Sequence, residues 1–159
     1  MEKRISVRTT INNKVYDFEI EPRLLVVDLI RYNAGLKGTH VACDTGNCGA
    51  CTVIMNGLSV KSCQVLAPRA HGGEITTVEG LRSGEKLHPI QEAFWECDAV
   101  ECGYCTPGML MTTIAFLKDN PHPSEDEIRT AYSGNLCRCT GYLNIIKAVK
   151  RAAEKMSAS

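Results

Sequence analysis

The chain has 159 residues, of which 18 are basic and 18 acidic, so its formal net charge is zero. That length allows one compact domain or two small ones that share an interface. A neutral chain without a run of Lys or Arg argues against nucleic acid as a main partner. An apolar content of 44% excludes a disordered polar chain.

The N-terminal stretch bears on where the protein works. Its charged residues are not followed by an apolar core of signal-peptide length. The apolar run at residues 24–27 is far shorter than the roughly 20 residues that a membrane span needs. We therefore expect a cytoplasmic protein with no membrane span that is not exported by the general secretory route. Because thiols stay reduced in that compartment, nine cysteines indicate metal or redox chemistry.

The first half of the chain predicts a small mixed sheet with one helix across it. Apolar residues alternate on both sides of Asn12-Asn13, and Asn56-Gly57 is a strong hairpin turn between two further alternating runs. Between these hairpins, apolar residues recur with helical spacing up to Gly35. The expected elements are a hairpin at 3–20, a helix at 24–34, strands at 52–55 and 58–62, and a strand at 74–78.

From about residue 85 the pattern becomes helical. Thr106 is expected to cap a helix that has Pro107 at its first position, and Ser124 with Glu127 forms a capping box. The last predicted helix has one apolar face. We expect four helices, through 90–96, 107–118, 128–132 and 141–156, and a boundary between the two halves in the polar stretch 79–87.

Four cysteines of the first half have a spacing that is typical of one class of cofactor. They are Cys43, Cys48, Cys51 and Cys63, in the pattern C-x4-C-x2-C with the fourth eleven residues later. This is the plant-type ferredoxin spacing, in which four soft thiolates hold a [2Fe–2S] cluster. A structural zinc site uses paired knuckles, which this loop does not have. We therefore predict a first [2Fe–2S] cluster here.

A second set of cysteines lies in the helical half. Its members are Cys102, Cys105, Cys137 and Cys139, in the pattern C-x2-C and then C-x-C. By itself this pattern also occurs in zinc sites, and its first pair in thioredoxin-like redox motifs, so both alternatives stay open at this point. Each pair precedes a predicted helix start, and two helix N-termini favour an anionic cluster. A second [2Fe–2S] cluster is therefore the preferred interpretation.

The remaining cysteine and the histidines fit no ligand pattern. Cys97 follows the helical spacing of Phe94, so we expect it to pack as a small apolar residue. No histidine has metal-ligand spacing to another histidine or to a carboxylate, and all are read as non-ligands: His40, His71, His88 and His122.

Three segments together resemble a known family. Residues 38–53, 101–109 and 133–142 closely resemble the iron–sulfur subunit of the molybdenum hydroxylases, the xanthine oxidase family. Within this family, the sequences of these segments are most similar to those of the small subunits of aerobic-type carbon monoxide dehydrogenase, aldehyde oxidoreductase and 4-hydroxybenzoyl-CoA reductase. The resemblance covers about residues 4–153 and favours iron–sulfur over zinc or redox thiols in the second set.

The resemblance implies a fold and a function. The fold is α+β, with a β-grasp, plant-type ferredoxin domain and its distal cluster at 1–80, then an all-α four-helix domain with the proximal cluster at 85–157. The function is electron transfer between the molybdopterin cofactor of a large subunit and FAD of a medium subunit, in an oxidoreductase whose active site lies outside this chain. The implied assembly is a dimer of heterotrimers.

The resemblance also singles out two residues near the pterin. Cys139 corresponds to the ligand whose surroundings touch the pterin, and Glu101 stands where the family commonly has Gln. An ionised carboxylate can only accept hydrogen bonds, whereas an amide both donates and accepts. Glu101 could therefore face pterin N–H donors, be protonated, or belong to a rearranged contact. We expect the first.

Two other classes of function remain as alternatives. A free-standing ferredoxin-like carrier would be expected to have a strongly acidic docking face, which a neutral chain lacks. A zinc-bound structural module would be colourless, whereas [2Fe–2S] proteins are red-brown. The electron-transfer subunit is the interpretation that uses both cysteine sets.

Overall fold

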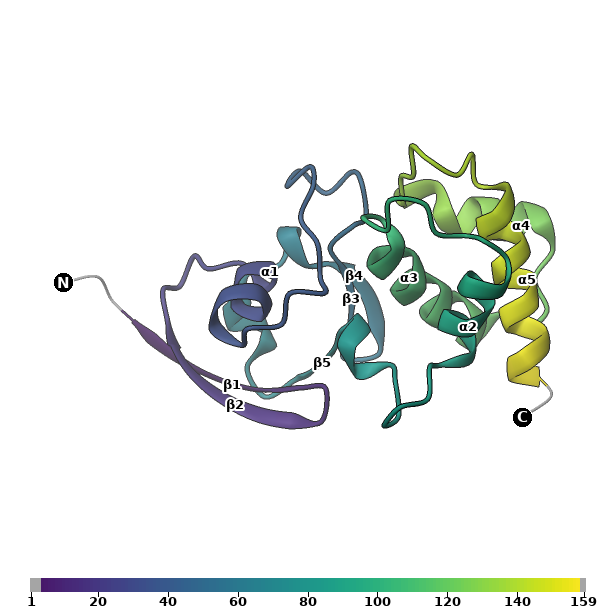
Figure 1. Cartoon of the computed structure of the whole chain (residues 1–159). Coiled ribbons are helices and arrows are strands. Elements are labelled where there is room, and N and C mark those ends of the chain that lie inside the picture. The colour runs from purple at the N-terminus through teal and green to yellow at the C-terminus, as the bar shows by residue number, and fades with distance from the viewer. Residues whose placement is uncertain (1–3, 158–159) are drawn as a thin grey trace.

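The computed structural model describes residues 4–157, which form a sheet half and a helical half joined side by side (Figure 1). The sheet has five strands in the order β2-β1-β5-β3-β4. Their bounds are Ile5–Ile11 for β1, Lys14–Ile20 for β2, Thr52–Met55 for β3, Leu58–Lys61 for β4 and Glu74–Thr76 for β5. The predicted α+β class is confirmed.

The register of the sheet follows from its turns. The hairpin β1–β2 is antiparallel, and its loop residues Asn12 and Asn13 have φ of 49° and 65°. Such left-handed pairs match the twist of two-residue hairpins, and Asn tolerates them. Strand β5 pairs parallel with β1 and antiparallel with β3, so the two hairpins become one sheet.

The predicted helix at 24–34 is present, but only its beginning is α-helical. Helix α1 covers Val26–Asp28 and continues as a π-helical segment over Leu29–Asn33, closed by the bond from Ala34 N to Leu29 O at 2.9 Å. Its buried side chains pack with sheet residues such as Ile11 and Ile75. One widened turn barely alters apolar spacing, so the sequence pattern could not distinguish it.

The helical half contains the four predicted helices. They are α2 Pro89–Glu96, α3 Thr106–Asp119, α4 Glu125–Ala131 and α5 Leu143–Ser157. The capping box of Ser124 and Glu127 is confirmed. None of the helices in the described part of the chain has the length and apolar content that crossing a bilayer demands.

Two predicted helix starts are displaced. Thr106 is the first residue of α3 rather than its cap, because a turn from Gly103 O to Thr106 N already brings the chain into helical geometry at Cys105. The last helix begins at Leu143 and not near 141. Gly141 and Tyr142 have φ of 62° and 68°, which a right-handed helix cannot include.

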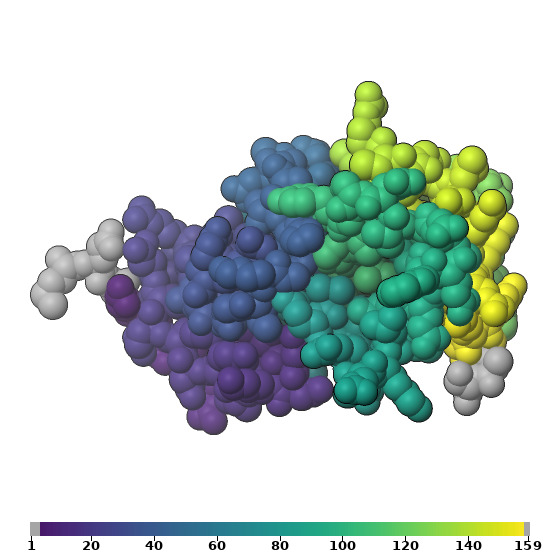
Figure 2. Space-filling view, in the orientation of Figure 1, coloured from purple at the N-terminus to yellow at the C-terminus, as the bar shows by residue number. Residues whose placement is uncertain are grey.

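Helix α3 joins the two halves. Figure 1 shows it between the strands β3 and β4 on one side and the other helices on the other. At Gly108 the backbone of α3 approaches Gly49 and Ala50 so closely that an added Cβ would overlap the Gly49 carbonyl oxygen and lie 3.0 Å from Ala50 Cα. The surfaces of the two halves are continuous in Figure 2. The division into 1–80 and 85–157 stays a prediction.

Candidate metal centres

The first set of cysteines begins on a loop whose backbone points at sulfur. Backbone N–H groups of Thr45 and Cys48 donate to Cys43 Sγ over 3.4 and 3.3 Å. Hydrogen bonding from Thr45, and after it from Cys48, lowers the pKa of the Cys43 thiol to about 6. The loop therefore holds Cys43 ready as a thiolate, which is the form that binds metal.

The loop takes this path because of its small residues. Gly46 and Gly49 have φ of 78° and 72°, a region in which side chains other than Asn and Asp are strained, and Asp44 joins them at 54°. A Cβ on Gly46 would lie 2.9 Å from Gln64 Cγ. The glycines thus let the backbone approach closely around the place where a cluster would bind.

The last two cysteines of the first set, Cys51 and Cys63, are buried. Cys51 and Cys63 are each 3% exposed and pack together with Val27. Burial, and after it the neighbouring Cys63, raises the pKa of the Cys51 thiol to about 11. A bound cation would offset the cost of ionising these thiols, since metals deprotonate the thiols that coordinate them.

The second set brings its sulfur atoms together in pairs. The Sγ atoms of Cys102 and Cys139 are 3.6 Å apart, and both residues are exposed. Cys105 interacts with Cys137, and both are half-buried. Burial, and after it the neighbouring Cys137 and Cys102, raises the pKa of the Cys105 thiol to about 12. Thiols from two segments that are distant in sequence therefore meet here in two pairs.

Two hydroxyl groups that the sequence analysis missed organise the second segment. The Thr140 hydroxyl donates to Cys137 Sγ at 3.2 Å, and the Tyr142 hydroxyl accepts from Cys137 N at 2.8 Å. Although burial raises it, the pKa of the Cys137 thiol lies below its usual value because of hydrogen bonds from Thr140 and Cys139. The sequence pattern predicts only that a helix begins near Gly141, and no sequence signal identifies the roles of Thr140 and Tyr142.

These residues fit the predicted clusters by the chemistry of their donors. Within residues 4–157, no group of three or more His, Cys, Asp or Glu side chains converges as a site for a single metal ion. Six of the eight thiols instead associate pairwise, Cys51 with Cys63, Cys105 with Cys137 and Cys102 with Cys139. An all-thiol set with N–H and O–H donors to sulfur suits an anionic iron–sulfur cluster.

The residues that were predicted to lie outside the clusters have other contacts. Cys97 packs against the helical core, as expected. His88 caps α2, where its Nδ1 accepts from Ile90 N at 3.3 Å, and Gln91 completes a capping box that sequence reasoning missed. His40 stacks on Tyr104 with ring centroids 4.6 Å apart.

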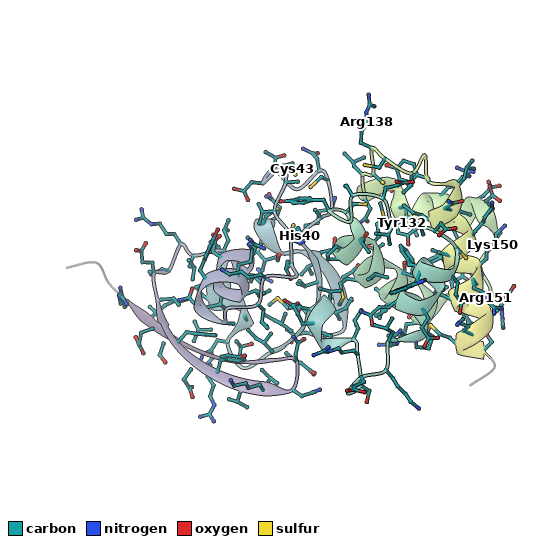
Figure 3. The ribbon with its side chains drawn as sticks, viewed as in Figure 1. His40, Cys43, Tyr132, Arg138, Lys150 and Arg151 are labelled. Carbon is teal, nitrogen blue, oxygen red and sulfur yellow. The ribbon has the colours of Figure 1, made fainter. Side chains whose placement is uncertain are left out.

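The exposed side of the second set carries two charged residues. Glu101 is exposed and directly precedes Cys102. Arg138 stands between Cys137 and Cys139 in the chain, and Figure 3 shows its side chain projecting from the same side of the molecule as Cys43. One residue from each cysteine loop therefore lies on this side of the molecule.

Two family models match adjacent parts of the chain. The model described as "2Fe-2S iron-sulfur cluster binding domain" matches residues 9–77, and the one described as "[2Fe-2S] binding domain" matches 77–150. The first range contains all cysteines of the first set, and the second range contains all those of the second. The chain thus has two [2Fe–2S]-binding domains in succession.

Known proteins are similar over nearly the whole chain. The nicotinate dehydrogenase small FeS subunit of Eubacterium barkeri is 44% identical over 152 residues, which are 96% of this chain and 97% of that one. The iron–sulfur-binding subunit PaoA of aldehyde oxidoreductase from Escherichia coli (strain K12) is 42% identical over 158 residues, 90% of this chain and 69% of that one. A chain of quinoline 2-oxidoreductase from Pseudomonas putida 86 superposes with a TM-score of 0.94 at 45% identity, covering 98% of both.

Proposed function

This chain belongs to the small iron–sulfur subunits of the molybdenum hydroxylase family, and from that premise we propose how it works within an oxidoreductase complex. It relays electrons between the molybdopterin cofactor of a large partner subunit and FAD of a medium subunit. The observation that carries the proposal is the presence of two separate all-thiol sets on loops that meet where the two halves join.

The eight cysteines have the roles that their environments support. Cys43, Cys48, Cys51 and Cys63 would hold one cluster, and Cys102, Cys105, Cys137 and Cys139 the other. Each [2Fe–2S] cluster supplies a centre that gains and loses one electron. The chain contributes backbone and hydroxyl donors to the thiolates, and it excludes water from the buried pair Cys51 and Cys63.

Exposure indicates which side receives electrons. Cys102 and Cys139 are the two exposed members of the eight, whereas Cys51 and Cys63 are buried. A partner cofactor can therefore approach the second set directly. Together with the family pattern, this favours Cys139 as the pterin-side ligand, Glu101 as a neighbour of the pterin N–H groups, and the second set as the point of electron entry.

We further propose a cytoplasmic dimer of heterotrimers, each with one copy of this chain, one large and one medium subunit. The relatives are named as subunits of larger enzymes, which supports a permanent place in a complex. A free carrier would not need a second cluster domain. The partners would cover the open side at Cys102 and the loop around Cys43.

Cofactor content of the tagged chain, purified anaerobically with the proteins that accompany it, tests the proposal. We expect about four iron and four sulfide per chain, the sum of two [2Fe–2S] centres, with molybdenum and flavin in the complex. Cys105→Ser should lose about half of the iron. Cys97→Ser is the matched control and should lose none, because Cys97 belongs to neither set.

Other outcomes would contradict the proposal in distinct ways. If the second set held zinc in place of a cluster, it could not carry electrons, and the proposed relay would be refuted. Elution of the iron-loaded chain at its own mass of 17.4 kDa, without molybdenum or flavin, would favour the free-standing ferredoxin-like carrier.

A further inference from the structure

The loops of the two cysteine sets are joined by a backbone hydrogen bond. Leu136 N donates to Cys48 O at 2.9 Å. Cys48 belongs to the first set, and Leu136 directly precedes Cys137 of the second. One hydrogen bond and one peptide link therefore connect the backbone of a ligand residue in one half to that of a ligand residue in the other.

The side chain of Asn135 fixes this junction. It is 5% exposed, and its Nδ2 donates to Gly49 O over 3.3 Å while its Oδ1 accepts from Thr112 Oγ1 over 3.1 Å. Gly49 lies between Cys48 and Cys51, and Thr112 lies on α3. Asn135 thus ties the first cysteine loop, helix α3 and the second cysteine loop to one another.

The closeness of this contact leaves no room for adjustment. A Cβ on Gly49 would overlap Gly134 O and lie 2.6 Å from Asn135 Nδ2. The amide of Asn135 is therefore packed directly against the backbone of the opposite loop. A buried amide that keeps both partners has one orientation available, since any rotation would leave polar atoms unpaired.

We propose that Asn135 is the positioning residue of the electron route between the two clusters, and that the route runs through the Leu136 N–H···O=C Cys48 hydrogen bond. The inference rests on the proposed function, because it needs a cluster at each set. Electronic coupling decays less steeply through covalent and hydrogen bonds than through gaps. One electron passes along the route: the cluster of the second set is oxidised by one electron and that of the first set is reduced by one, with no proton transferred.

The variant Asn135→Leu tests the inference, because it keeps the approximate size of the side chain and removes both hydrogen bonds. In the iron-loaded complex we expect the Leu136 amide to lose roughly tenfold in protection against hydrogen exchange, the equivalent of one hydrogen bond. After mixing with dithionite under anaerobic conditions, electron equilibration between the clusters should be slower. The magnetic splitting between the two reduced clusters in the EPR spectrum should decrease.

Asn144→Leu is the matched control. Its Nδ2 donates to Asp98 O over 3.1 Å, so the same type of amide–carbonyl bond is lost within the helical half alone. That variant should leave the Leu136 amide, the splitting and the equilibration rate unchanged. If Asn135→Leu does not fold, Thr112→Val removes only the donor to Asn135 Oδ1 and should produce the same three changes in weaker form.

The outcomes separate this inference from the function on which it rests. Wild-type protein without two [2Fe–2S] clusters would refute the proposed function itself. Two intact clusters in Asn135→Leu or Thr112→Val, with unchanged protection, splitting and equilibration rate, would overturn the positioning role and leave the relay function standing.

Discussion

At the scale of single residues, Glu101 stands where the resemblance implies that the family commonly has Gln. It is exposed beside Cys102, one of the two exposed members of the second set. A carboxylate there adds a negative charge next to an anionic cluster, whereas an amide adds none. A negative charge disfavours the arrival of an electron, so we expect this residue to tune the potential of the second cluster, the proposed point of electron entry, without altering the fold.

We predict that Glu101→Gln raises the reduction potential of the second cluster by roughly tens of millivolts, the scale of one partly screened charge. Redox titration followed by EPR measures both clusters in the same sample, and the first cluster should not change. Asp119→Asn, the same change at the far end of α3, is the control and should leave both potentials unaltered. An unchanged potential and rate in Glu101→Gln would count against the proposed pterin contact.

The grouping of the cysteines into two sets follows from their spacing and agrees with the ranges of the two family models, whereas the side chains around them could not be predicted. The spacing of ligands along the chain is a local property that can be read directly from the sequence, as in the C-x4-C-x2-C loop. The Tyr142 hydroxyl accepts from Cys137 N, and Tyr142 itself has a left-handed backbone, φ 68°. Spacing predicts neither such a φ nor the contact of Asn135 with Gly49, which are 86 positions apart.

At the scale of elements, helix α3 determines how the halves fit. It follows Cys105 directly, and its Gly108 contacts the Gly49–Ala50 backbone beside strand β3. The sequence predicted this helix well, but it gave no indication of which face would meet the sheet. From sequence alone, a glycine inside a helix indicates only a lower helix propensity. The packed structure shows that this glycine makes room for the backbone of another segment.

We predict that Gly108→Ala destabilises the protein by about 1–3 kcal/mol, the usual cost of overpacking. Alanine is the better helix former, so the loss would come from contact with backbone atoms that cannot move aside. Gly134→Ala is the control, since its Cβ would meet only the flexible end of Lys61, with Nζ at 3.1 Å. Thermal unfolding of the iron-loaded chain measures both variants, and a Gly108→Ala variant as stable as wild type would show that the contact at Gly108 relaxes without cost.

At the scale of the whole molecule, the proposed electron route passes through the two sets in series. The second set opens to the surface through Cys102 and Cys139, and the first set adjoins it through the contact of Leu136 with Cys48. The neutral chain lacks the strong net charge that would steer brief encounters with many partners. Lasting contact with fixed partners on the open side therefore suits this molecule better than diffusion between them.

If electrons pass through the two sets in series, loss of one cluster should have a different effect from loss of the other. With Cys51→Ala, electrons from substrate should still reach the second cluster, but the flavin should stay oxidised. With Cys105→Ala, neither the second cluster nor the flavin should be reduced by substrate. EPR and flavin absorbance of the anaerobic complex after substrate addition distinguish these states. Cys97→Ala is the control, in which substrate should reduce all centres. Full turnover to the terminal acceptor in Cys51→Ala would contradict the serial order, because the electrons would then have a route that does not pass through the first set.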